Sequence, residues 1–258
     1  MTFRAQFSNY FNSCIKGLAD LIGIILLPVY FNGKTIFIST DIWKSFRLEY
    51  ETYISEILQQ YLKRGDVFFD IGAHYGLWTL YASKLVGGEG KSIAFEPSGA
   101  YKYLDINLHN NKNCLAVNQG LSNEDNFRKF YSQGYSTSGS FIKEITNINR
   151  KFSPDVDVTN RSVIVNKIDT YCSKNLIYPD LLKIDVEGHE YKVIEGAKDL
   201  LNTKKPKLII EIHPPQLQYE DTTDNELLEL LKNLNYEFKI INQNKNSIYT
   251  VFAINKEI

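Results

Sequence analysis

The chain has 258 residues, which is enough for one large domain or two small ones with a substantial buried core. Hydrophobic residues make up 43% and charged residues 23%, values that exclude a disordered, collagen-like or multi-span membrane protein. The 29 basic and 30 acidic residues leave a formal net charge of -1. No overall field therefore attracts DNA, RNA or acidic lipid, and nucleic acid is not an expected partner.

Three cysteines, Cys14, Cys114 and Cys172, stand far apart in the sequence. Their odd number and wide spacing fit neither a disulfide framework nor a paired-cysteine metal or redox site. A reducing, cytoplasmic setting is the predicted location.

An uncharged run, Leu21–Gly33, lies near the N-terminus. Asp20 interrupts the apolar stretch and no small-residue cleavage site follows, so the run is not typical of a signal peptide. It is also shorter than the roughly 18–20 residues that a membrane-spanning helix needs. We interpret it as a buried helix end leading into a strand. Contact of residues 14–31 with a membrane surface is the disfavoured alternative.

Two β-rich stretches within Val29–Ile38 flank Asn32 and Gly33, a pair that strongly indicates a hairpin turn. Apolar residues then recur at three- and four-residue steps from Trp43 to Leu62, which predicts one long helix. Residues 1–60 are therefore expected to form a helix and hairpin extension.

From residue 61 to 258 short apolar runs alternate with helical patterns, which predicts βαβ units and an α/β fold around a parallel sheet. The predicted strands are Asp66–Asp70, Lys91–Glu96, Cys114–Asn118, Leu181–Asp185 and Lys207–Ile212. Helices are expected near residues 76–86, 100–111 and 189–201.

The C-terminal part predicts a helix after Thr223 and then two strands, Tyr236–Ile241 and Ser247–Ile254, paired as an antiparallel hairpin at one sheet edge. Residues 119–165 are rich in Ser, Asn and Gly and contain shorter β-prone stretches. We expect this insertion to run over the functional rim of the sheet.

Acids and histidines gather at the carboxyl ends of the predicted strands, the edge where open α/β sheets bind ligands. They are Asp70, Glu96, Asp185, Glu187, Glu211, His74, His189 and His213.

The first strand leads into the turn DIGAHYG, in which Gly72, Ala73, His74 and Gly76 are expected to contact a cofactor. Glycines let the backbone approach a ligand, and the next helix presents free N–H groups. A dinucleotide fingerprint needs a glycine at the position of Asp70. A carboxylate there suits instead the ammonium group of S-adenosylmethionine.

Glu96 and Pro97 end the second strand, from which a carboxylate accepts hydrogen bonds from both hydroxyls of a ribose. Asn118 and Gln119 end the third strand, where side-chain amides meet an adenine edge. Ordinary loop polarity explains this second pair equally well.

The densest cluster is LLKIDVEGHE, which places Asp185, Glu187, His189 and Glu190 after an apolar strand. Such crowding is typical of sites that use perturbed pKa values. An acidic first helical turn accounts for Glu187 and Glu190 but not for His189.

The sequence resembles the FkbM-type family of S-adenosylmethionine-dependent methyltransferases from about residue 47 to 212. The matching motifs are DIGAHYG, FEP at Phe95–Pro97, Asn107, KID at Lys167–Asp169, KIDVEGHE at Lys183–Glu190 and Glu211. The family usually has Asn at the position of His74.

The resemblance implies a class I methyltransferase fold, a Rossmann-like, seven-stranded, mostly parallel sheet with one antiparallel strand in the C-terminal hairpin. It also implies S-adenosylmethionine as cofactor and O-methylation of a small molecule or a glycan sugar. No residue pattern identifies the acceptor.

The expected mechanism is in-line methyl transfer to an acceptor hydroxyl while a base removes its proton. His189 is the preferred base, Asp185 orients it or the cofactor's amino group, and Glu187 is the third catalytic candidate. Glu211 and His213 are expected to contact the acceptor.

Three alternatives stay open. In a metal-assisted variant, Asp185, His189 and His213 hold a divalent ion, but their spacing is not that of a dedicated site, so no metal is expected. An NAD-dependent oxidoreductase is disfavoured by the missing GxGxxG turn. A non-catalytic adenosine-ligand binder or interaction protein remains, because fold alone does not fix activity.

Overall fold

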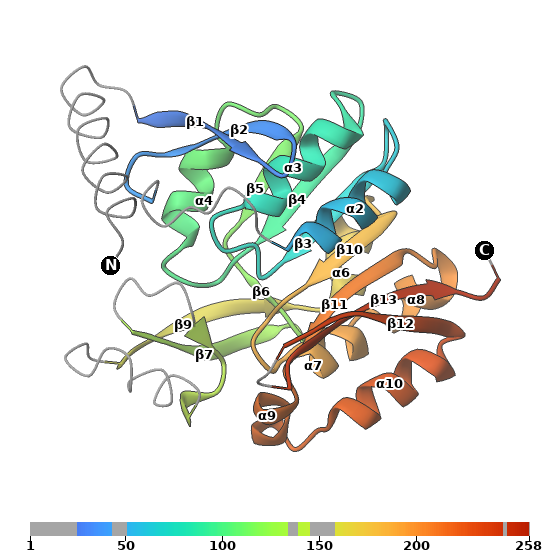
Figure 1. The fold of residues 1–258 in the computed structure, drawn as a ribbon. Helices are drawn as coiled ribbons and strands as arrows, with labels where there is room; N and C mark the ends of the chain where they lie inside the picture. Colours follow the sequence, from blue (N-terminus) through green and yellow to red (C-terminus); the bar gives the residue numbers. More distant parts are fainter. Residues whose placement is uncertain (1–24, 43–50, 134–138, 145–157, 245–246, 258) are drawn as a thin grey trace.

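The computed structural model describes residues 25–42, 51–133, 139–144, 158–244 and 247–257. Its centre is a seven-stranded sheet of order β12-β13-β11-β10-β3-β4-β5 (Figure 1). The strands are β3 (Val67–Ile71), β4 (Lys91–Phe95), β5 (Cys114–Val117), β10 (Leu181–Ile184), β11 (Lys207–Ile212), β12 (Tyr236–Gln243) and β13 (Tyr249–Asn255).

All strands from β3 to β11 in this sheet pair in parallel, and β13 lies between β11 and β12, antiparallel to both. The predicted class I methyltransferase sheet with one antiparallel strand is therefore confirmed. The strand order reverses beside β3, which pairs with β4 on one side and β10 on the other. Ligands bind at such a switch point, outside the carboxyl ends of the strands.

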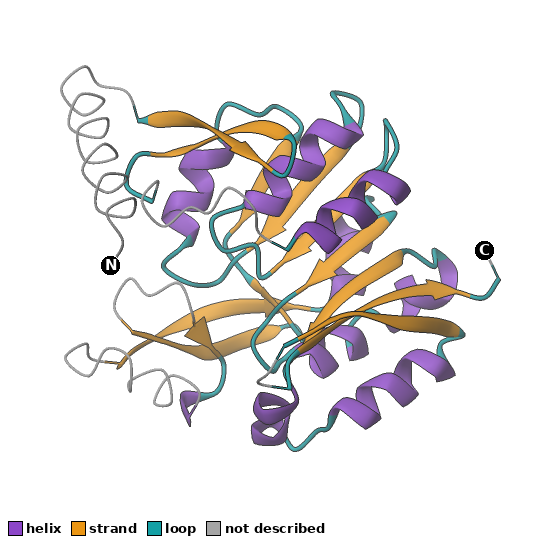
Figure 2. Cartoon of the chain, in the orientation of Figure 1, coloured by secondary structure: helices purple, strands orange, loops and turns teal. Residues whose placement is uncertain are grey.

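Helices cover both faces of the sheet (Figure 2). Alternation along β3 explains why both faces are apolar, since Phe68 packs into one core and Phe69 into the other. One layer holds α2 (Thr52–Tyr61), α3 (Leu77–Val86) and α4 (Tyr101–Leu108), and the other holds α6 (Ile168–Asn175), α7 (Glu190–Glu195), α8 (Lys198–Thr203) and α10 (Asp224–Asn233).

An N-terminal hairpin of β1 (Leu26–Phe31) and β2 (Lys34–Ser39) lies on the α3 and α4 layer. The predicted Asn32-Gly33 turn joins its strands. Phe31 is fully buried and meets the rings of Trp78 and Tyr81 edge to face. The hairpin thus shares a core with the main sheet, and the division at residue 60 stays a prediction.

The insertion forms a small second sheet of order β6-β9-β7-β8 next to the carboxyl ends of the main strands (Figure 1). Its strands are β6 (Gly120–Leu121), β7 (Asn126–Gln133), β8 (Gly139–Ser140) and β9 (Val158–Asn166). β7 pairs antiparallel with β9 along the whole length of β7.

The prediction of a single helix at residues 189–201 is wrong, because the structure has two helices there, α7 and α8. The break lies at Gly196, where a Cβ would come 1.9 Å from the backbone oxygen of Ser122. This close approach of two backbones interrupts the helix. A short α9 (Pro214–Leu217) and a 3-10 turn, η2 (Gln218–Glu220), follow β11.

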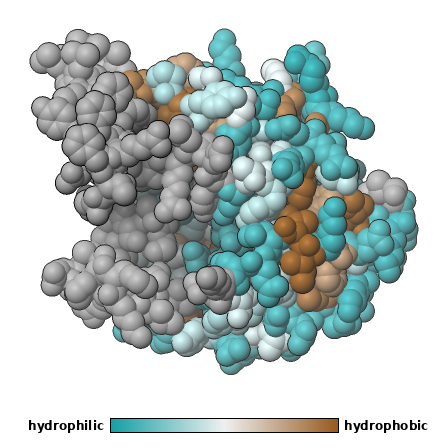
Figure 3. Space-filling view, in the orientation of Figure 1, coloured by the Kyte–Doolittle hydropathy of each residue, from teal (hydrophilic) through white to brown (hydrophobic). Residues whose placement is uncertain are grey.

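The N-terminal predictions lie partly outside the described residues. Residues 1–24, with most of the proposed membrane-contact segment, and residues 43–50 are not described. The single helix predicted from Trp43 to Leu62 is wrong in its extent, because α2 begins at Thr52 after Glu51, whose left-handed φ of 45° interrupts a helix. Within the described residues, no helix has the length and apolarity needed to span a membrane. On the face shown in Figure 3, the described residues are mostly hydrophilic, and hydrophobic side chains gather over the edge hairpin of β12 and β13.

Candidate active site

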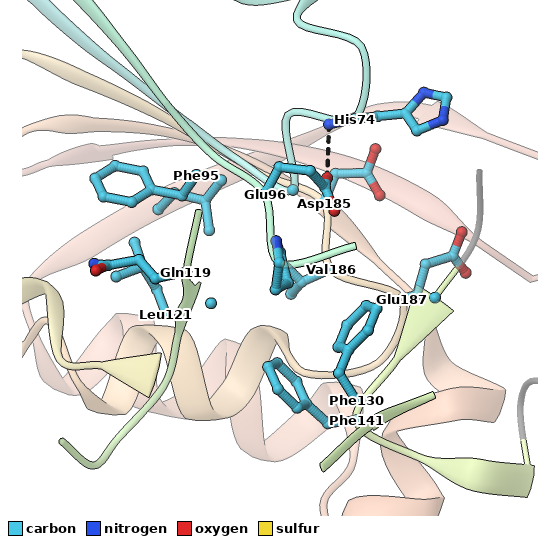
Figure 4. A pocket seen from close by; sticks show the side chains of 15 residues that line it. His74, Phe95, Glu96, Gln119, Leu121, Phe130, Phe141, Asp185, Val186 and Glu187 are labelled. Carbon is cyan, nitrogen blue, oxygen red and sulfur yellow. Dashed lines mark hydrogen bonds between the residues drawn. The ribbon is translucent and has the colours of Figure 1, made fainter. Parts of the chain in front are cut away.

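A cavity of about 270 Å³ lies at the carboxyl ends of β3, β4 and β10 (Figure 4). The structure places seven of the predicted site residues on its wall: Gly72, His74, Glu96, Pro97, Gln119, Asp185 and Glu187. Figure 4 shows Glu96 and Asp185 below the His74 turn, with Phe95 and Gln119 to one side.

Gly72 brings the turn after β3 against the loop after β10. Its φ of 78° lies in the left-handed region, and a Cβ on it would come 1.8 Å from the carbonyl oxygen of Asp185. The N–H groups of Gly72 and Ala73 both donate to the carbonyl of Phe95. Only a residue without a side chain fits this junction of three strands.

Gly76 and Ala73 shape the same turn without lining the cavity. Gly76 stands before α3 with a φ of 79°, and a Cβ there would come 2.5 Å from Leu104 Cδ1. Ala73 is buried in the core on the α3 side. Their contribution is therefore to the path of the backbone.

Glu96 follows β4 and is almost fully buried. Its Oε2 accepts a hydrogen bond of 2.8 Å from the His74 N–H, and its Oε1 accepts one of 2.7 Å from the Ser98 N–H. Burial raises the pKa of the carboxyl, while these N–H groups oppose the rise. Each carboxylate oxygen has two lone-pair sites, so both oxygens keep one for a ligand.

The ring of His74 lies 3.7 Å from that of Tyr75, centroid to centroid. Burial lowers the pKa of His74 to about 4, so the imidazole is neutral at pH 7. Its Nε2 has no hydrogen-bond partner among the described residues. His74 has a left-handed φ of 53°, and Glu187 has one of 52° on the opposite loop.

The insertion supplies a wall that sequence reasoning missed. Phe130 and Phe141 line the cavity and meet edge to face at 5.1 Å (Figure 4). The only sequence signal for them was the expectation that the insertion covers the rim. The Nε2 of Gln119 is buried in the same wall without a partner in the described part of the chain, whereas Asn118 is exposed and does not line the cavity.

Lys183 is buried and its Nζ lies 3.0 Å from Asp185 Oδ2. Burial lowers the pKa of Lys183, but the carboxylates of Asp185 and Asp70 outweigh it and raise the pKa above its usual range. Burial likewise opposes ionisation of Asp185, and Lys183 keeps its pKa below the ordinary value. The two side chains therefore form a buried ion pair.

Asp70 does not line the cavity. It is buried behind the wall, where Thr79 donates a 2.6 Å hydrogen bond to its Oδ2. Its Oδ1 has no partner among the described residues, and burial raises the pKa of its carboxyl. Asp70 raises the pKa of Lys183, so its charge can influence the cavity through that residue, and direct contact of Asp70 with a cofactor stays a prediction.

Glu211 and His213 stand beside Asp185, and one ligand atom from each of the three lies within 4.8 Å of the others. Burial and Asp185 raise the pKa of Glu211 to about 8. His189, named in the metal-assisted alternative, is not a member of this group. Because Lys183 already pairs with Asp185, and His213 with Glu190, the contacts favour an ion-pair network over metal ligation.

His189 lies apart from the cavity and is only 1% exposed. Its Nε2 is 3.0 Å from Ser122 Oγ and 3.3 Å from Arg128 Nη1, and its Nδ1 is 3.1 Å from Glu220 Oε1. Its ring centroid lies 4.8 Å from that of Phe141. Both ring nitrogens are engaged, so this geometry supports a role in holding Phe141 over removal of a proton from an acceptor.

Replacing His189 by Ala is therefore expected to lower the free energy of unfolding by about 2–4 kcal/mol, because it leaves a cavity and removes buried hydrogen bonds. Urea denaturation followed by circular dichroism measures the loss, with His109→Ala as the matched control, since His109 is exposed. If His189→Ala kept its stability but lost turnover, the result would support His189 as the catalytic base.

Residues 70–238 match the family model described as "Methyltransferase FkbM domain". This match confirms the predicted enzyme class, an S-adenosylmethionine-dependent methyltransferase, and its cofactor. The chain belongs to the FkbM methyltransferase family.

Two curated relatives each align with this chain over about two thirds of their own length. Hexuronic acid methyltransferase AglP of Haloferax volcanii is 23% identical over 175 residues, covering 67% of this chain and 66% of the relative. The 31-O-demethyl-FK506 methyltransferase FkbM of Streptomyces tacrolimicus is 26% identical over 176 residues, covering 59% of this chain and 67% of the relative.

Among solved structures, methyltransferase FkbM from Methylobacillus flagellatus aligns with a TM-score of 0.48 and 15% identity, over 79% of this chain and 51% of that chain. Fibrillarin of Aeropyrum pernix aligns with a TM-score of 0.46 and 12% identity, over 89% and 94%.

Proposed function

We propose that the protein transfers the methyl group of S-adenosylmethionine to an oxygen of a small-molecule or glycan acceptor, with a sugar hydroxyl as the preferred position. The observation that carries the proposal is a cavity at the switch point that joins the anchored Glu96 to the acids Asp185 and Glu187. The names of the two relatives support the acceptor class, since one concerns a hexuronic acid and the other an O-demethyl substrate.

The charge of the cavity favours this cofactor over NAD. Glu96, Asp185 and Glu187 all line the wall, and Lys183 is paired behind it. S-adenosylmethionine carries positive sulfonium and ammonium groups, which carboxylates attract, whereas the same carboxylates repel a pyrophosphate. The wall therefore suits a cationic ligand with an adenosine end.

Each part of the wall has a distinct role in this proposal. Glu96 accepts hydrogen bonds from ribose hydroxyls, the unpartnered amide of Gln119 meets the adenine edge, and Asp185 attracts the ammonium group. Gly72 allows the backbone to approach the ligand closely. When bound, the cofactor supplies an electrophilic methyl group.

Glu187 is the proposed base, in place of His189. It lines the cavity, and its side chain is 38% exposed, so an acceptor hydroxyl can reach it. Burial raises the pKa of its carboxyl, and His213 opposes that rise. A carboxylate with a raised pKa accepts a proton more readily than an ordinary one while it remains ionised.

Isothermal titration with S-adenosylmethionine, S-adenosylhomocysteine and NAD tests the cofactor assignment. Both sulfur ligands are expected to bind and NAD is not. Binding of NAD alone would support the oxidoreductase alternative instead. Incubation with methyl-labelled cofactor and sugars with or without a carboxylate then tests the reaction, and binding without any labelled product would favour a non-catalytic adenosine-ligand protein.

A further inference from the structure

The loop that carries Glu187 is held by the buried carboxylate of Glu190. Glu190 begins α7 and is fully buried. Its Oε1 accepts a 2.9 Å hydrogen bond from the Gly188 N–H and lies 2.9 Å from Nδ1 of His213. Glu190 thus joins the loop after β10 to the residue that follows β11.

Tight packing holds the same loop in one position. Gly188 has a φ of 100°, and a Cβ on it would come 2.5 Å from Cβ of Gln216 in α9. His213 is the residue immediately before α9 and is 3% exposed. The loop packs against α9 and His213 is the N-cap residue of that helix, so loop and imidazole are parts of one packed unit.

The contact at Nδ1 directs the other side of the His213 ring toward the cavity. When Nδ1 donates to Glu190, Nε2 is the nitrogen that remains, and it lies 3.7 Å from Oε2 of Glu187. A buried carboxylate that orients an imidazole is a recurrent device for fixing which nitrogen faces a reacting group. Here the imidazole faces the carboxylate that lines the cavity.

We propose that Glu190 and His213 are positioning residues that hold Glu187 ionised and aimed at the acceptor. This inference rests on the proposed function, in which Glu187 takes the proton of the acceptor. It assigns to His213 an electrostatic role toward Glu187, in addition to the acceptor contact expected from the sequence.

The charges around His213 support a protonated imidazole. The ionisable groups that face it are Glu190 of α7, Glu187 and Asp185 of the loop after β10, Glu211 of β11 and, through Asp185, Lys183 of β10. Burial lowers the pKa of His213, but the acids outweigh it and raise the pKa to about 10. The imidazolium then stabilises the negative charge of Glu187.

The test measures ionisation directly, without an acceptor. Protein labelled at histidine nitrogens and at glutamate carboxyl carbons is titrated by NMR, and His213→Gln assigns the His213 signals among the four histidines. His213 is expected to stay protonated through pH 8 in the wild type and to lose its proton at lower pH in Glu190→Gln. In His213→Gln, the pKa of Glu187 is expected to rise by about one unit, because a neighbouring positive charge is gone.

The pH profile gives the second readout. A base must be deprotonated, so activity falls as the pH drops through the pKa of Glu187. The acid limb of kcat is therefore expected to move about one unit to higher pH in His213→Gln and to return in His213→Lys, which restores a positive charge. His109→Gln, at an exposed histidine, is expected to leave the limb in place.

Two outcomes would overturn the proposal: a neutral His213 at pH 7 in the wild type, or a Glu187 pKa that is the same in His213→Gln. Thermal melting shows whether each variant is folded, which separates these two outcomes from misfolding. If His213→Gln fails to fold, the titration of His213 in Glu190→Gln provides the test. Because the NMR titration needs no substrate, its result does not depend on whether the protein transfers a methyl group. Absence of methylation with the NMR result intact would reject the proposed function and, with it, the role toward an acceptor, and would leave the electrostatic coupling of His213 and Glu187 established.

Discussion

Replacing Gly72 by Ala is expected to destabilise the fold by about 3–5 kcal/mol and to abolish cofactor binding. Two costs add at this position. The left-handed φ of 78° disfavours any L side chain, and the new Cβ would lie 1.8 Å from the carbonyl oxygen of Asp185. That atom is backbone, so relief requires separation of two paired strands, β3 and β10.

Gly33 provides the matched control. Its φ of 87° is equally left-handed, but a Cβ there would meet no atom within 4 Å. Gly33→Ala should therefore show the backbone cost alone, about 1 kcal/mol. Urea unfolding of both variants isolates the contribution of the close contact. Equal losses in the two variants would mean that the junction of Gly72 and Asp185 is looser than described.

Replacing Glu96 by Ala is expected to weaken binding of S-adenosylmethionine about 100-fold, equivalent to about 2.8 kcal/mol. The substitution removes the proposed acceptors of the ribose hydroxyls. It also leaves the N–H groups of His74 and Ser98 without their partner, which loosens the turn above the cavity. Both effects lower affinity in the same direction.

Isothermal titration measures the loss, and Glu96→Gln separates its two parts. Gln keeps one carbonyl oxygen but turns an amide N–H group toward one of the two backbone donors, so its affinity should fall between wild type and Ala. Glu237→Ala, on the edge strand β12 and exposed, is the control and should bind normally. Full affinity in Glu96→Ala would remove this residue from the cofactor site.

Most of the sheet could be predicted from the sequence because its strands are short apolar runs buried on both faces. Leu181–Ile184 is buried at every position. Two β-rich runs around a polar turn predicted the terminal hairpin. The division of the helix after residue 189 could not be predicted. It depends on Gly196 meeting the backbone of Ser122, a contact between segments distant in sequence.

The acids of the candidate site could be predicted for the same topological reason, since parallel strands bring their carboxyl ends to one edge. Glu96, Asp185 and Glu187 were found in this way. The sequence does not show the direction in which His189 points, because that depends on its partners Ser122 and Glu220 in other segments. The aromatic wall of the insertion likewise depends on long-range packing.

The left-handed backbones of His74 and Glu187 imply a conflict between robustness and activity. Non-glycine residues in this region cost of order 1–3 kcal/mol each, and the two lie on facing turns of one cavity. Glycine at either position would relax the backbone and raise the melting temperature. At Glu187 it would also remove the proposed base, so selection for heat resistance alone should drive that position toward a more stable and less active protein.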